Sequence, residues 1–252
     1  MTETVQVTIN DEGSSIYALL DRPADAGKYP AVIMSHGYMG SHSDFNNEAR
    51  LFARKGFVVC RFDFCGGAPG SLSSGRSLDM TIFTELDNLL SVFAYVEGLD
   101  YVDSDRIFLM GASQGGFVSM LAAEELKNKV RALMLYYPAF CIPDDFRRHF
   151  PAITDIPDEF DLWGMLLGRD FSLSIRNLDP YERMGKYGGP VLIIHGDKDG
   201  VVDLSYSQRA VRALPDAKLI VFEGEGHGFS PLYAAKGAGI FADFAMERLE
   251  QI

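Results

Sequence analysis

The sequence predicts one α/β domain built on a mostly parallel central sheet with helices on both faces. Two observations support this class. Short β-branched and aliphatic runs alternate with longer stretches whose apolar residues recur every three or four positions. Most of the short runs are continuously apolar, as expected of strands buried on both faces. The length of 252 residues suits one such domain with room for an insertion.

The order of the predicted elements is more informative than their boundaries. Residues 5–9 and 15–20 are predicted to form an antiparallel pair, joined by the turn residues Asn10, Asp11 and Gly13. Six buried strands are predicted at residues 31–34, 57–62, 106–110, 131–136, 191–194 and 219–222. Flanking helices are predicted at residues 45–54, 83–96, 115–126, 205–214 and 239–249.

One segment breaks this alternation. Residues 140–186 are rich in Pro, Asp, Arg and aromatic side chains and lie between two predicted strands. Loops of this length in compact domains are usually functional or carry structure of their own. We therefore expect a core formed by residues 1–139 and 187–252, with residues 140–186 as an inserted lid.

Composition and charge exclude several classes of function. The net charge of -12 disfavours binding to nucleic acids and to anionic membrane surfaces. The longest apolar run, at residues 132–142, is interrupted by Pro138 and is too short for a membrane span. Residues 1–6 lack the basic start and apolar stretch of a secretory signal, and three cysteines without a CxxC pair suggest free thiols. We expect a cytoplasmic protein.

A G-x-S-x-G motif marks the candidate nucleophile. It runs from Gly111 to Gly115, directly after a predicted strand and directly before a predicted helix. Ser113 would sit on a sharp turn whose crowded backbone requires small residues on either side. The turn would present the hydroxyl at the carboxyl edge of the sheet, where open α/β folds bind their ligands.

A serine hydroxyl requires a base, and the base requires a partner that fixes its tautomer. His227 is the candidate base because it lies in a glycine-rich loop after the last predicted strand. The segment after the 191–194 strand offers two carboxylates, Asp197 and Asp199, and we choose Asp199. The resulting order of Ser, Asp and His is that of α/β-hydrolases.

These residues resemble the α/β-hydrolase superfamily, whose acid usually stands in an H-G-x-x-D-x-x-V stretch like residues 195–202; this resemblance favours Asp199. Residues 61–64, 79–81 and 156–163, together with the Ser-Gln-Gly-Gly turn, are similar to bacterial cinnamoyl and feruloyl esterases. The resemblance implies a lid that holds an aromatic acyl group.

The same resemblance implies roles for three further residues. The backbone amides of Tyr38 and Gln114 would form the oxyanion hole. Trp163 and Tyr38 would contact the substrate, although Trp163 could equally pack the lid onto the body. Relatives often carry Phe where this chain has Tyr38.

Together these features predict a carboxylic ester hydrolase that works through a Ser113, His227 and Asp199 triad and an acyl-enzyme, on hydroxycinnamate esters. No metal or cofactor is expected, and the sequence has no Walker A loop, HExxH helix or complete GxGxxG. A general short-acyl carboxylesterase is the main alternative, followed by a peptidase and by a binding module without activity. We expect a small-molecule ester as the binding partner, and the sequence leaves a homodimer open.

Overall fold

The computed structural model describes residues 2–11 and 13–250, which form a central sheet of eight strands. In spatial order the strands are β1 (Thr2–Asp11), β2 (Ser14–Pro23), β4 (Val58–Phe62), β3 (Tyr29–Ser35), β5 (Val102–Ala112), β6 (Val130–Tyr136), β9 (Val191–Gly196) and β10 (Ala217–Phe222). The pairs β1–β2 and β2–β4 are antiparallel, and every other neighbouring pair is parallel. The predicted mostly parallel sheet is confirmed.

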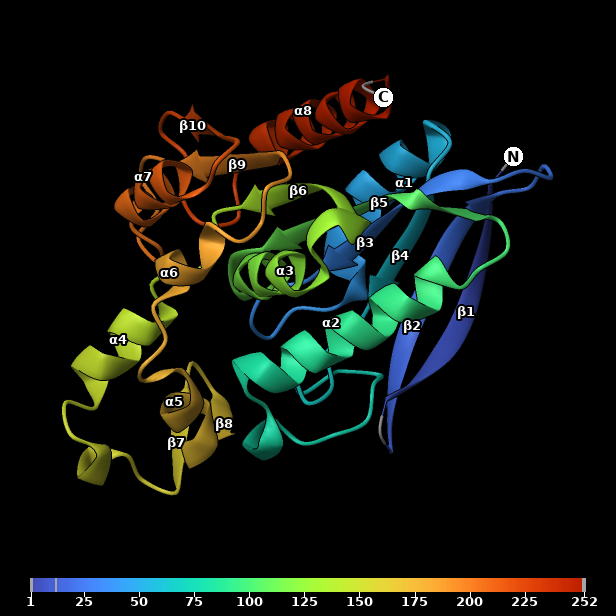
Figure 1. Cartoon of the computed structure of the whole chain (residues 1–252). Helices are drawn as coiled ribbons and strands as arrows, with labels where there is room; N and C mark the ends of the chain where they lie inside the picture. Colours follow the sequence, from blue (N-terminus) through green and yellow to red (C-terminus); the bar gives the residue numbers. More distant parts are fainter. Residues whose placement is uncertain (1, 12, 251–252) are drawn as a thin grey trace.

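Helices cover both faces of the sheet (Figure 1). One face carries α1 (Asn46–Arg54) and α8 (Pro231–Glu250), and the other carries α2 (Ile82–Glu97), α3 (Ser113–Leu126) and α7 (Leu204–Ala213). All five predicted helices are present. The last begins at Pro231 rather than at residue 239, since a proline is well tolerated in the first turn of a helix.

The central strands are continuously apolar because both of their faces are buried. In β3, Ala31 and Ile33 pack into the core beneath α2 and α3, whereas Val32 and Met34 pack into the core beneath α1 and α8. Successive side chains of a strand point to opposite faces, so a strand between two helical layers needs apolar residues throughout. This packing fixes the sheet edge at which the candidate site residues emerge.

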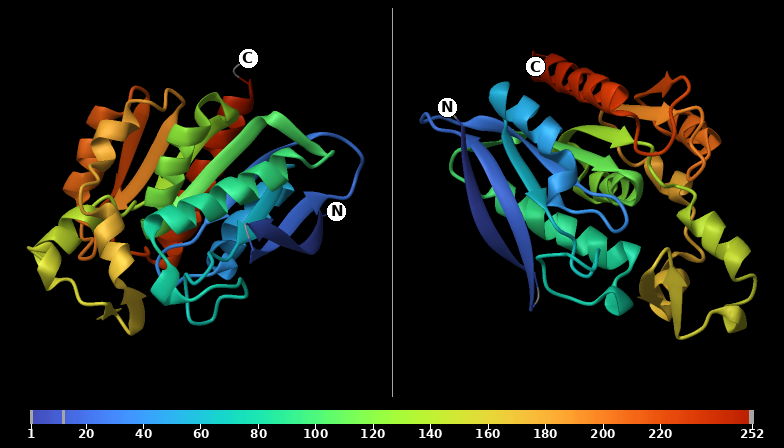
Figure 2. Two further views of the ribbon diagram at one scale, coloured as in Figure 1. Left: turned by 60° about the horizontal axis from the view of Figure 1, so that its bottom comes forward. Right: turned by 180° about the vertical axis from the view of Figure 1, so that it is seen from behind.

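The segment between β6 and β9 has structure of its own. It contains α4 (Ile142–His149), a hairpin of β7 (Glu159–Leu162) and β8 (Met165–Gly168), α5 (Arg169–Ile175) and α6 (Pro180–Met184). Figure 2 shows α4, the hairpin and α5 beside one end of the sheet. Gly168 lies so close to Leu78 that an added Cβ would stand 2.1 Å from the Leu78 carbonyl oxygen, so the hairpin packs tightly on the segment before α2.

No helix within residues 2–11 and 13–250 is both long and apolar enough to cross a bilayer.

Candidate active site

Ser113 occupies a sharp turn between β5 and α3. Its φ angle is +53°, an uncommon backbone conformation for a residue with a side chain. A Cβ on Gly111 would lie 2.4 Å from the Gly115 carbonyl oxygen, and one on Gly115 would lie 2.2 Å from the His36 carbonyl oxygen. Glycine is therefore required on both sides of this serine, as the G-x-S-x-G motif predicts.

The side chains of Ser113, His227 and Asp199 form a connected set. The loop between β10 and α8 carries His227, and the loop after β9 carries Asp199. The Nε2 atom of His227 lies 3.1 Å from the Oγ atom of Ser113, and its Nδ1 atom lies 2.8 Å from the Oδ2 atom of Asp199. In this geometry a neutral imidazole donates to the carboxylate and accepts from the serine hydroxyl.

The Asp199 carboxyl group is held in its ionised form. Its side chain has no exposed surface, and burial alone would raise its pKa. Hydrogen bonds outweigh this effect: His195 and His227 face its Oδ2 atom, while the Val201 and Val202 amides donate to its Oδ1 atom at 2.8 and 2.9 Å. The pKa of Asp199 therefore lies well below its ordinary value.

The alternative carboxylate, Asp197, faces elsewhere. Its Oδ1 atom accepts a hydrogen bond of 2.6 Å from the Gly224 amide, and its Oδ2 atom lies 3.9 Å from the Lys198 ammonium group. Between the two carboxylates that the sequence offers, the structure brings Asp199 to the imidazole of His227.

His195 is a contact of Asp199 that the sequence reasoning missed. Its Nε2 atom lies 2.9 Å from the Val202 carbonyl oxygen and 3.2 Å from the Asp199 carboxylate, and its Nδ1 atom lies 2.7 Å from the Ser207 hydroxyl. These partners require the proton on Nε2. The position of His195 at the end of a buried strand was the signal that could have found it.

The backbone amides of Tyr38 and Gln114 lie beside the serine. Tyr38 follows Gly37, whose added Cβ would be 3.2 Å from the Cβ of Ser113, and Gln114 is in the first turn of α3. Neither amide has an acceptor among residues 2–11 and 13–250. Two unpaired N–H groups next to a serine hydroxyl are suited to receive a developing negative charge.

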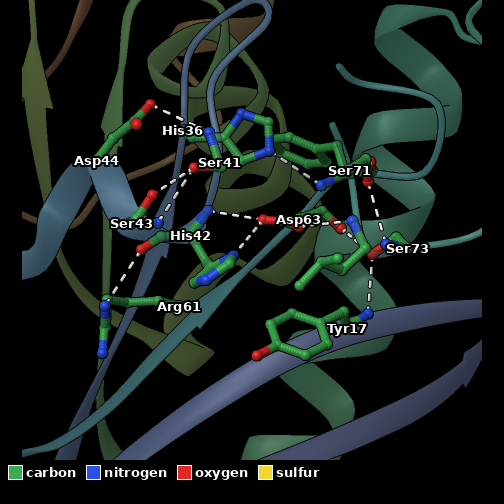
Figure 3. Close-up of polar contacts among 12 residues, drawn as sticks. Tyr17, His36, Ser41, His42, Ser43, Asp44, Arg61, Asp63, Ser71 and Ser73 are labelled. Carbon is green, nitrogen blue, oxygen red and sulfur yellow. Dashed lines mark hydrogen bonds and ion pairs between the residues drawn. The ribbon is translucent and has the colours of Figure 1, made fainter. Parts of the chain in front are cut away.

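A network of polar contacts holds the loop that carries Tyr38 (Figure 3). The Phe64 amide donates to Nε2 of the buried His36 at 3.0 Å, which leaves the proton on Nδ1, 2.7 Å from the Gly37 carbonyl oxygen. Burial lowers the pKa of His36 and favours this neutral form. Next to Phe64, the Asp63 carboxylate accepts from the amide and the Nδ1 atom of His42, both at 2.7 Å.

The side chain of Gln114 is anchored by a second residue that the sequence reasoning missed. Its Nε2 atom donates to the Oε2 atom of Glu85 on α2 at 2.8 Å. Glu85 is buried, and burial raises the pKa of its carboxyl group to about 8. Nothing in the local sequence around Glu85 signals this contact, because α2 and α3 meet only in the folded chain.

Two cavities meet at Ser113. The first, of about 220 Å³, extends beneath α4 and the hairpin and is mainly apolar. The second, of about 290 Å³, extends on the side of His227. Tyr38 and Trp163 line both cavities.

Trp163 lies at the tip of the β7–β8 hairpin. Its φ angle is +52° and that of Gly164 is +91°, as in a two-residue hairpin turn of type I′. The indole is 68% exposed and makes an edge contact with the Tyr38 ring, with centroids 6.0 Å apart. The Tyr38 hydroxyl donates to the Leu162 carbonyl oxygen at 2.9 Å, so it ties the hairpin to the loop after β3.

Comparison with known proteins supports a hydrolase. The sequence profile of the prolyl oligopeptidase family matches residues 43–251. Dipeptidyl-peptidase 5 of Aspergillus fumigatus is 31% identical over 189 residues; the match covers 68% of this chain, and the chain spans about a quarter of the length of that relative (24%). A probable 2-oxo-3-(5-oxofuran-2-ylidene)propanoate lactonase from Bradyrhizobium sp. is 24% identical over 90% of this chain and 86% of the relative.

Solved structures support the predicted fold and resemblance. Est1E from Butyrivibrio proteoclasticus, solved with ferulic acid bound, is 28% identical, with a TM-score of 0.87 over 97% of this chain and 100% of that chain. Acetyl xylan esterase 1 from Thermoanaerobacterium sp. JW/SL YS485 shares the fold at 23% identity, with a TM-score of 0.72 over 98% of this chain and 84% of that chain. The α/β-hydrolase fold and the resemblance to bacterial cinnamoyl esterases are confirmed.

Proposed function

The chain belongs to the prolyl oligopeptidase family and is a serine hydrolase of the α/β-hydrolase fold, and from this premise we propose that it hydrolyses esters of hydroxycinnamic acids through an acyl-enzyme on Ser113. One observation carries the proposal. The hydrogen-bonded set of Ser113, His227 and Asp199 opens onto an apolar cavity of about 220 Å³.

Acylation follows from the directions of these hydrogen bonds. As the Ser113 oxygen attacks the ester carbonyl carbon, its proton passes to Nε2 of His227. The carbonyl oxygen becomes an oxyanion, which the Tyr38 and Gln114 amides stabilise. Collapse of this intermediate breaks the bond to the alcohol, and the alcohol leaves with the proton from His227.

Deacylation repeats these reaction steps, with water as the nucleophile in place of the Ser113 hydroxyl. His227 takes a proton from the attacking water, and the second tetrahedral intermediate releases the acid and restores the Ser113 hydroxyl. Asp199 keeps its negative charge throughout, since its depressed pKa favours the ionised form. It stabilises the imidazolium that forms in both steps.

The lining of the apolar cavity is suited to an aromatic acyl group. Phe146 and Phe171 line it together with Leu162 and Trp163, and such a lining favours a flat, apolar acid. Asp145 also lines the cavity and offers a carboxylate that can accept a hydrogen bond from a phenolic hydroxyl. The relative that holds ferulic acid has the same fold over nearly the whole chain.

Amide hydrolysis is a second candidate function, favoured by the similarity to dipeptidyl-peptidase 5. The same side chains would serve, but His227 would have to protonate a poorer leaving group. A short-acyl carboxylesterase is the third candidate, in which the lid would only exclude water.

The test compares kcat/KM for methyl ferulate, methyl butyrate and an aminoacyl anilide. We expect kcat/KM to fall in the order ferulate, butyrate, anilide, and a preference for butyrate or for the anilide would overturn the substrate assignment.

Trp163→Ala should raise KM for methyl ferulate by roughly tenfold, which corresponds to the loss of about 1.4 kcal/mol of aromatic contact. Leu166→Ala is the matched control, because Leu166 is an exposed hairpin residue that lines neither cavity.

A further inference from the structure

The carboxylate of Asp199 lies between two imidazoles. The Nδ1 atom of His227 is 2.8 Å from its Oδ2 atom, and the Nε2 atom of His195 is 3.2 Å from the same oxygen. The two imidazoles differ in exposure, because the side chain of His227 is 22% exposed whereas that of His195 is completely buried. His195 lines neither cavity at Ser113. It therefore contacts the reacting groups only through Asp199.

A buried serine on α7 fixes the tautomer of His195. The Oγ atom of Ser207 lies 2.7 Å from Nδ1 of His195, and Ser207 has no exposed surface. The Ser207 hydroxyl donates to Nδ1, so the proton of the neutral imidazole is on Nε2. There it faces the Val202 carbonyl oxygen at 2.9 Å and the Asp199 carboxylate. The other tautomer would turn a nitrogen lone pair toward both of these oxygens, which is unfavourable.

The second imidazole completes the set of donors around the Asp199 carboxylate. Its Oδ1 atom accepts from the Val201 and Val202 amides, and its Oδ2 atom accepts from the two imidazoles. Donors on both oxygens hold the carboxylate in one orientation, with Oδ2 toward His227. The donor from His195 also stabilises negative charge on Oδ2, so less of this charge acts on the imidazole of His227.

We propose that His195, oriented by Ser207, is a positioning residue for the catalytic set: it holds the Asp199 carboxylate toward His227 and sets the pH range in which His227 acts as the base. The ionisation of Asp199 supports this role. Burial opposes it, yet hydrogen bonds from His195, His227 and two backbone amides bring the pKa of Asp199 below its ordinary value. The inference rests on the proposed hydrolysis through Ser113, but it does not depend on the identity of the substrate.

Other titratable groups also face the two imidazoles. Asp203, at the start of α7, acts electrostatically on His195. The ring of Tyr137 packs on His227 with centroids 4.4 Å apart, and burial raises the pKa of its hydroxyl, which favours the neutral form. Two carboxylates line the cavity beside His227, namely Asp44 and Glu48. All of these groups are retained in the variants below, so a difference between variants reports the contact that has been changed.

The pH dependence of kcat/KM for 4-nitrophenyl acetate tests the proposal, because its acid limb reports the pKa of the base in the free enzyme. In His195→Leu the Oδ2 atom of Asp199 loses a donor, so more negative charge stabilises the imidazolium of His227. The acid limb should move to higher pH by roughly 0.5 to 1 unit. The plateau value of kcat/KM should fall by about tenfold, since the carboxylate is less firmly oriented. A limb that stays in place or moves to lower pH would overturn the inference.

His195→Gln separates the hydrogen bond from simple packing. The side-chain amide of glutamine can bring an N–H group close to the position of the imidazole Nε2–H, whereas leucine fills a similar volume without a donor. We expect the glutamine variant to return the acid limb close to that of the unmodified protein and to recover most of the lost kcat/KM. Equal shifts in the leucine and glutamine variants would overturn the inference.

Ser207→Ala removes a single buried oxygen, so it tests the inference even if the His195 variants fold poorly. Without the donor to Nδ1, the Nε2–H of His195 becomes a weaker donor, and the acid limb should move in the same direction by a smaller amount. The control is Gln208→Ala, at an exposed position of α7, which should leave the limb in place. An unmoved limb in Ser207→Ala would overturn the inference. Absence of any acetate release that depends on Ser113 would instead refute the proposed function itself, so the two failures are distinguishable.

Discussion

The Nδ1 atom of His36 lies 2.7 Å from the carbonyl oxygen of Gly37, in the same peptide unit that carries the Tyr38 N–H. The carbonyl and the N–H of a trans peptide unit point in opposite directions. Anchoring the oxygen therefore aims the Tyr38 amide, and the Gly40 amide supports the same oxygen at 2.9 Å.

His36→Phe should lower kcat by about tenfold to a hundredfold with little change in KM, because one of the two proposed oxyanion donors loses its alignment while the two cavities at Ser113 stay intact. Steady-state kinetics with a good ester substrate provide the measurement. His42→Gln is the control: it changes the neighbouring histidine, which contacts Asp63 and not Gly37. Equal losses in both variants would contradict the positioning role of His36.

The two carboxylates after β9 give a matched pair of variants. Asp199→Asn should reduce kcat by roughly a thousandfold to ten-thousandfold, because the imidazole loses the partner that fixes its tautomer and stabilises its positive charge. Asp197→Asn should stay within a few-fold of the unmodified protein, since Asp197 contacts Gly224 and Lys198 instead. A large loss in the Asp197 variant with a small one in the Asp199 variant would reverse the assignment.

Glu85 makes the stability of the fold dependent on pH. Burial raises its pKa to about 8, so between about pH 4.5 and 8 the folded chain keeps a proton that the unfolded chain has released. The stabilisation by the protonated Glu85 carboxyl group is complete below the pKa that this group has in the unfolded chain. It is lost as the pH rises through the pKa that the group has in the folded chain.

Glu85→Gln removes this titration and can keep the hydrogen bond from Gln114. Relative to the unmodified protein, its free energy of unfolding should increase progressively from pH 4.5 to 8, by up to several kcal/mol, and the difference should be constant above pH 8. Urea denaturation at a series of pH values measures this difference. The exposed Glu223→Gln serves as control, and a difference independent of pH in Glu85→Gln would contradict the account.

The sequence was sufficient to predict the sheet and its helices, because burial on both faces leaves a direct mark on composition. β3 shows this, with neighbouring residues packed into opposite cores. The hairpin of β7 and β8 was not predicted. Its strands have four residues each, too few for a clear period, and its turn places a tryptophan at a positive φ angle.

In the site, Ser113, His227 and Asp199 were predictable because each follows a strand and has a distinct chemical signature. Glu85 was not, because its importance comes from its burial and from its contact with Gln114, which is distant in the chain, and the local sequence records neither. His36 and His195 were partly predictable, because each stands at the end of a buried strand before a glycine. Only the fold shows that His36 contacts the Gly37 carbonyl oxygen and that His195 contacts the Asp199 carboxylate.

Covalent labelling with a fluorophosphonate, followed by peptide mapping, tests the central claim most directly. We predict a single adduct on Ser113, formed in parallel with the loss of ester hydrolysis, and labelling at least about a hundredfold slower in His227→Ala, since the serine is then without its base. An adduct on another residue, or ester hydrolysis that persists after Ser113 is fully modified, would contradict the account.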